Sequence, residues 1–229
     1  MGLLDFLSKD KRDQRAFDRN LKRVLRRTRA KDERMDESIH YLADLDTEQA
    51  LTGLLRRYDV TIKSESMDRF EKELIYNILV DKGAKSIPPI LAFLKGSDNV
   101  TWPIQALRSL TTEEKVVEAL CAVLAEENTK DSFKPDKKVR LLELLSDHKD
   151  PRVPPVVADA LKDFDETVRY GAVETLFIQD DESAREPLLA ALTDPDEESQ
   201  RIRKRILKGF VDTGWTVRGF RKPVEGQLE

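Results

Sequence analysis

The chain has little of several things that define common classes of protein. Its 229 residues include one cysteine and 9 glycines, and only 7% of them are aromatic. A single cysteine cannot form an internal disulfide, so we expect Cys121 to be a buried thiol in a reducing cytoplasm. Few glycines and aromatic residues argue against a β-sandwich or barrel. No apolar run approaches the roughly 18 residues of a membrane-spanning helix, so we expect no such helix.

Patterns that signal catalysis or cofactor binding are also missing. The two histidines, His40 and His148, are far apart in the chain, and neither has a second ligand at metal-binding spacing. The glycines are scattered and form no phosphate-binding loop. Cys121 lies in an apolar run with no adjacent base to activate it. The sequence therefore predicts a protein without a metal, a cofactor or catalytic residues, which is not an enzyme.

Charge is abundant and unevenly distributed. Residues 1–31 carry a net charge of +7, residues 32–199 carry −16, and residues 200–222 carry +7. The overall charge of −4 therefore conceals two basic ends and an acidic body. Because an acidic body repels a phosphate backbone, the charge pattern argues against nucleic acid as the partner.

Apolar clusters recur along the chain and end at Leu94, Leu124, Leu161 and Leu192, which are 30, 37 and 31 residues apart. Within each cluster the apolar residues follow helical spacing, and repeats of this length indicate stacked helical pairs. We expect the pairs at 33–45 with 47–57, 66–81 with 84–95, 102–110 with 113–126, 136–146 with 151–162, and 165–179 with 183–193, followed by a last helix at 196–210. The strand-like residues 59–63 are interpreted as an extended link.

The segment from Asp165 to Leu176, DETVRYGAVETL, resembles the signature of HEAT repeats, including the short type found in phycobilisome-lyase-like bacterial proteins. The segments around residues 55–62, 102–103 and 214–215 are similar to a group of bacterial HEAT-repeat proteins. The resemblance implies an all-α solenoid of about five helical pairs over residues 32–212. A basic arm at 1–31 and a tail at 213–229 would flank it.

Asp and Arg stand four residues apart at Asp165/Arg169 and again in the pair Asp136/Arg140. In HEAT solenoids such residues resemble a ladder that joins neighbouring repeats. Asp196 is followed at the same spacing by Gln200, so we expect the ladder to stop there.

The resemblance also implies a function. HEAT proteins commonly bind through a surface lined by the second helix of each pair, where Glu118, Asp159 and Lys162 are the candidate contact residues. We therefore expect a scaffold or adaptor whose partner is another protein. Enzymatic relatives, the bilin lyases and alkyl-base DNA glycosylases, leave a lyase-like or nucleic-acid-binding role as the alternative.

The N-terminal arm allows three interpretations. Phe17 and Val24 belong to an apolar helical stripe set among basic residues that include Arg23, Arg26 and Arg27. Such a helix can lie on an anionic membrane surface. It can also dock in the groove of an acidic protein, or fold back as a cap that neutralises its own acidic body. At the other end, Trp215 is interpreted either as packing over the last repeat or as a binding anchor.

Overall fold

The computed structural model describes residues 3–27, 33–128 and 135–226, and of residues 3–9 only the backbone. α-Helices and short 3₁₀ turns make up the regular structure of these residues, with no strand among them. The chain divides into two compact units, residues 1–112 and 113–229. No helix within the described ranges is both long and apolar enough to cross a membrane.

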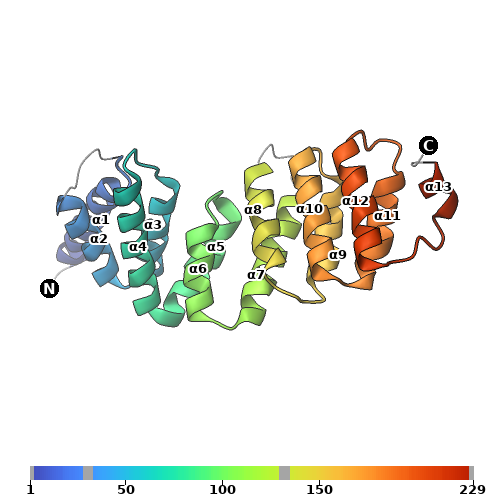
Figure 1. Ribbon diagram of the computed structural model, residues 1–229. Helices are drawn as coiled ribbons and strands as arrows, with labels where there is room; N and C mark the ends of the chain where they lie inside the picture. Colours follow the sequence, from blue (N-terminus) through green and yellow to red (C-terminus); the bar gives the residue numbers. More distant parts are fainter. Residues whose placement is uncertain (1–2, 28–32, 129–134, 227–229) are drawn as a thin grey trace. The chain divides into compact units, whose positions relative to one another are not determined.

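The first unit contains helices α1 to α6 (Figure 1). Their bounds are Leu3–Val24 for α1, Glu33–Leu45 for α2, Glu48–Leu55 for α3, Glu65–Asp81 for α4, Ile87–Gly96 for α5 and Thr101–Leu110 for α6. Helix α1 packs against α2, α3 packs against α5, and α4 packs against α6.

The second unit contains helices α7 to α13. Their bounds are Glu113–Asn128 for α7, Pro135–Ser146 for α8, Val153–Asp159 for α9, Glu166–Gln179 for α10, Arg185–Thr193 for α11, Gln200–Thr213 for α12 and Arg221–Glu225 for α13. Helices α8, α10 and α12 form one layer, and α7, α9 and α11 form the other (Figure 1).

The predicted all-α class and the helical pairs are confirmed. All four leucines that mark the sequence repeat are buried, from 0% exposed for Leu94 and Leu124 to 6% for Leu161. Prolines stand in the first turns of α5 and α9, where a missing N–H removes no helical hydrogen bond. The predicted arm and tail boundaries, at residues 31 and 212, stay predictions.

The last predicted helix, 196–210, is displaced in the structure. It begins at Gln200 because the Ser199 hydroxyl caps it by accepting a hydrogen bond from the amide of Ile202. It continues to Thr213 and ends at Gly214, whose φ of 70° favours glycine.

Each unit also contains an aromatic cluster with one tryptophan. In the first unit Trp102 stacks on Tyr58, with ring centroids 6.3 Å apart and ring planes at 9°. In the second unit Trp215 lies 5.8 Å from Phe177 and 6.0 Å from Phe210, measured between centroids. Packing over the last repeat is therefore the arrangement that the structure gives Trp215.

Candidate functional site

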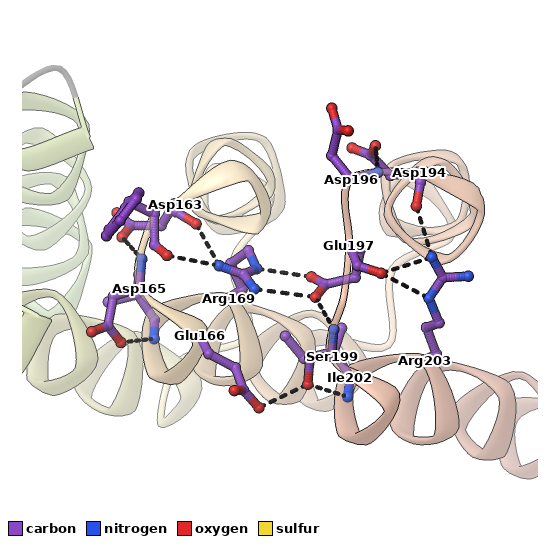
Figure 2. A network of polar contacts seen from close by, with 12 residues as sticks. Asp163, Asp165, Glu166, Arg169, Asp194, Asp196, Glu197, Ser199, Ile202 and Arg203 are labelled. Atoms are coloured by element: carbon purple, nitrogen blue, oxygen red, sulfur yellow. Dashed lines mark hydrogen bonds and ion pairs between the residues drawn. The ribbon is translucent and has the colours of Figure 1, made fainter.

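A polar network fixes helix α12 against helix α10 (Figure 2). It begins at Asp165, whose carboxylate caps α10 by accepting hydrogen bonds from the amides of Thr167 (2.7 Å) and Val168 (3.4 Å). Hydrogen bonds from the Thr167 hydroxyl and from these amides hold the pKa of Asp165 below its ordinary value. The start of α10 is therefore defined by a charged cap.

Arg169 spans two consecutive loops from its place on α10. Its Nη1 donates to the carbonyl oxygens of Asp163 and Phe164, both at 2.9 Å. Its Nε and Nη2 donate to the two carboxylate oxygens of Glu197 at 2.8 and 3.1 Å. Burial alone would raise the pKa of Glu197, but the hydrogen bonds from Arg169 and from the amide of Ser199 outweigh it, so this pKa is lowered. The pair joins one repeat to the next.

The network continues at Arg203, and the prediction that the ladder stops after Arg169 is therefore wrong. Arg203 lies 34 residues after Arg169 and donates to the carbonyl oxygens of Glu197 (Nε, 3.0 Å) and Asp194 (Nη2, 2.9 Å). Ser199, the cap of α12, stands at the same distance from Asp165. The sequence comparison aligned Asp196 with Asp165, three residues too early, because it looked for Asp where Ser serves equally well as a cap.

The ladder takes a different form one repeat earlier. Arg140 donates to Glu143 of its own helix at 2.8 Å. Lys138, on the same helix, donates to the carboxylate of Asp163 at 2.5 Å and so ties α8 to the loop before α10. The tie to the following repeat thus runs through a lysine that the Asp/Arg spacing did not indicate.

Between α8 and α10 lies a groove of about 380 Å³, which we call the α8–α10 groove. It is lined by Val139, Leu142, Glu143 and Ser146 of α8, by Thr167, Tyr170, Gly171, Glu174, Thr175 and Ile178 of α10, and by Arg201 of α12. Gly171 keeps it open, because a Cβ there would lie 3.3 Å from Cδ1 of Leu142. The rim carries charge, and Ile178 is 46% exposed.

Arg201 gives the groove a positioned cation. Its guanidinium carbon lies 3.7 Å from the ring centroid of Tyr170, which is a cation–π contact. Nearby, Glu174 accepts two hydrogen bonds from Arg205, at 2.5 and 3.0 Å, and these hold the pKa of Glu174 below its ordinary value. Glu174 is thus already paired, whereas we find no hydrogen bond from the Arg201 guanidinium to any described residue.

A stacked guanidinium is held in one orientation while its N–H edge stays open. That edge has the geometry to bind a carboxylate through two parallel hydrogen bonds. The groove therefore combines an apolar floor with a receptor for one negative charge.

The residues predicted to form the interaction face lie elsewhere in this unit. Glu118 is exposed on α7, Asp159 on α9, and Lys162 in the 3₁₀ turn that follows α9. They belong to the layer of α7, α9 and α11, and none of them lines the α8–α10 groove. Their role in binding stays a prediction.

Tyr170 and Arg201 were missed by the sequence reasoning. The one available signal was Gly171, because a glycine inside a helical pattern often marks close packing or open space beside the backbone.

The described part of the N-terminal arm forms helix α1 and folds against the first unit. Phe17 is 7% exposed and Val24 is fully buried, while Arg26 and Arg27 are exposed and Arg23 is half-buried. The remainder of the arm, residues 1–2 and 28–31, lies outside the described residues.

The isolated titratable groups of the sequence have ordinary surroundings. His148 is buried and its Nδ1 lies 2.9 Å from a carboxylate oxygen of Glu113. Burial raises the pKa of the Cys121 thiol to about 11. In the described ranges no group of three or more His, Cys, Asp or Glu residues has the arrangement of a metal site.

Comparison with known proteins agrees with this geometry. Residues 117–207 match the family model of HEAT repeats, a segment that contains the α8–α10 groove and most of the ladder network. No curated protein matches the chain.

Proposed function

We propose that this HEAT-repeat protein is a non-enzymatic scaffold that binds a partner polypeptide in the α8–α10 groove. The observation that carries the proposal is Arg201, which is stacked on Tyr170 with its N–H edge open beside an apolar floor. The buried Cys121, with its raised pKa, suits a reducing cytoplasm. The likeness to bacterial lyase-like repeats remains a prediction and plays no part in this proposal.

The groove defines the chemistry of the segment that it would hold. An apolar side chain of the partner would lie over Leu142 and Gly171, and burying a leucine-sized side chain contributes about 1.5–3 kcal/mol. A carboxylate of the partner would accept two hydrogen bonds from Arg201, where a charge-assisted bond contributes about 1.5–3 kcal/mol. The ligand is thus a segment with one apolar and one acidic side chain close together.

The ladder network explains why such a site can be rigid. Arg169, Glu197 and Arg203 fix the loop before α12 and therefore the first turn of α12, on which Arg201 stands. A binding group held by the scaffold loses little entropy when the partner binds, and this favours affinity.

Site-specific photo-crosslinking in the native cell tests the proposal. A photoreactive residue in place of Ile178 should capture one defined protein, and Arg201→Gln in the same chain should abolish the capture. The matched control is Val211, which is 81% exposed on α12 and outside the groove. With the purified partner, Arg201→Gln should weaken binding about tenfold or more.

Substitution of the groove itself gives a second measurement. Ile178→Asp should prevent binding, and Val211→Asp, the same change outside the groove, should leave it intact. Equal capture from both positions, or capture that Arg201→Gln does not change, would argue against the groove. Capture from Asp159 alone would instead favour the face of α7 and α9.

A further inference from the structure

The outward face of helix α1 is a continuous stripe of positive charge, which we call the α1 ridge. It consists of Lys11, Arg12, Arg15, Arg19, Lys22 and Arg23. At about 100° per residue these six positions fall on one side of the helix, opposite the buried Phe17, Asn20 and Val24. The acidic residues Asp10, Asp13 and Asp18 fall on the flanks and the inner side, outside the ridge.

The ridge is not neutralised by the rest of the chain. None of its six side chains forms an ion pair or a hydrogen bond to another described residue. The sequence suggested that a folded-back arm would be held by salt-neutralising contacts with the acidic body. Those contacts are not found in the described ranges, so the charge of the ridge needs another explanation.

Helix α1 docks by other means. Phe17 and Val24 are buried, and the Ser38 hydroxyl donates to the buried side-chain oxygen of Asn20 at 2.9 Å. Arg57 donates to the carbonyl oxygen of Val24, also at 2.9 Å. The apolar side of α1 between residues 17 and 24 is thereby occupied, and it cannot enter a lipid layer while the helix stays docked.

We propose that the α1 ridge binds the anionic surface of a lipid bilayer through headgroup contacts, without insertion of the apolar face of α1. Six cations lie within 13 residues, a length of about 18 Å along the helix. Each basic residue close to an anionic leaflet strengthens binding about fivefold, and clusters of four to eight are typical of lipid-binding segments. The ridge lies in this range.

The arrangement of charges favours a flat polyanion over a nucleic acid duplex. A planar surface contacts only the outermost stripe of a straight helix, and that stripe contains cations alone. A helix in the groove of a duplex has phosphates along both sides. There the flanking carboxylates of Asp13 and Asp18, both exposed, would face like charge. The ridge also offers no aromatic side chain for base stacking, since Phe17 is buried.

Vesicle sedimentation with the full chain tests the inference. The probes are vesicles of phosphatidylcholine with 30% phosphatidylserine and vesicles of pure phosphatidylcholine. We expect binding only to the anionic vesicles and a steep loss of binding between 50 and 300 mM salt. The variant Arg12→Gln/Arg15→Gln/Arg19→Gln should bind about a hundredfold more weakly. Because these side chains have no described partner, the variant should keep the circular dichroism spectrum of the parent.

Two controls isolate the ridge. Lys204→Gln/Arg218→Gln/Lys222→Gln removes the same charge from exposed residues near the other end, and it should bind as the parent does. Leu3→Ser/Leu4→Ser/Phe6→Ser removes apolar side chains at the start of α1 and should also retain binding.

Binding abolished by the serine variant but not by the ridge variant would overturn the inference, because insertion would then be the mechanism. A duplex DNA competitor that displaces the vesicles at equal charge and binds the ridge more tightly would also overturn it. These outcomes are independent of the α8–α10 groove, since photo-crosslinking at Ile178 reports on the groove alone.

Discussion

Arg57 holds the end of helix α1 in place through the carbonyl oxygen of Val24, which accepts a hydrogen bond of 2.9 Å from its Nη1. The last carbonyls of a helix have no partner within the helix, so a buried arginine from another element can satisfy them. The Nε of Arg57 donates to Glu71 at 2.9 Å, which balances its charge. Arg57 is 1% exposed, so one buried ion pair connects α1, the turn after α3, and α4.

Replacing Arg57 should destabilise the first unit strongly. Arg57→Met leaves Glu71 as an unpaired buried carboxylate, and breaking a buried pair in this way costs about 3–5 kcal/mol. Urea unfolding followed by circular dichroism measures the loss. The control is Arg69→Met on the same helix as Glu71, because Arg69 forms an exposed pair with Glu73, a kind that contributes only about 0–1 kcal/mol. Equal losses in the two variants would show that α1 is held by apolar packing alone.

The pair of Arg169 and Glu197 should make stability depend on pH in a defined direction. The pKa of Glu197 is lowered in the folded chain, so its contribution is present above the unfolded pKa and is lost as pH falls through the folded pKa. Arg169→Gln should cost about 1.5–3 kcal/mol at pH 7. The difference from the parent should shrink as pH falls below about 4.5, the ordinary pKa of glutamate.

Urea unfolding at a series of pH values from 7 to 3 measures this difference. Arg221→Gln is the control, because Arg221 pairs with Glu225 at the surface and should show almost no change at any pH. A difference for Arg169→Gln that does not change with pH would mean that Glu197 is not the group responsible.

Gly209 should not tolerate even a methyl group. A Cβ at Gly209 would lie 2.1 Å from Cζ of Phe177, whose ring is enclosed by Phe210 and Trp215. Overpacking of this kind costs about 1–3 kcal/mol. Gly96→Ala is the matched control, because that position is also helical but has open space around it. There alanine should be neutral or stabilise the helix by up to about 1 kcal/mol. Thermal unfolding of both variants gives the comparison.

The thiol of Cys121 should react slowly in the folded chain. Its pKa is raised to about 11, mainly by burial, so only about one thiol in a thousand is ionised at pH 8. Labelling with a disulfide reagent should be slow at pH 8 and should accelerate as the pH rises toward 11. In urea, where the thiol regains a pKa near about 8.5, labelling should be fast. Rapid labelling of the folded chain at pH 7 would show that the thiol is accessible and activated.

The sequence predicts much of the fold because helical periodicity is a local property. The spacing of Leu94, Leu124, Leu161 and Leu192 indicated the repeats, and each of these leucines is buried. The ladder was harder to predict because different residues can fill one structural role. Ser199 caps α12 as Asp165 caps α10, and a search for Asp overlooked it.

The site could not be predicted because it depends on contacts across repeats. Tyr170 and Arg201 are 31 residues apart, and each is an ordinary exposed helix residue when considered alone. Similarly, the charge of α1 was visible in the sequence, whereas its lack of described partners became visible only once the helix was placed. Pairwise geometry of this kind has no periodic signature in a single sequence.

The two tryptophans are the chain's only two, and the structure places one in each compact unit. Trp102 stacks on Tyr58, and Trp215 lies against Phe177 and Phe210, so each indole has its own packed surroundings. Replacing either tryptophan by phenylalanine leaves a single intrinsic fluorophore in the other unit. The emission of the two single-tryptophan chains then follows the melting of each half separately, and it reveals whether the halves unfold in one transition or in two.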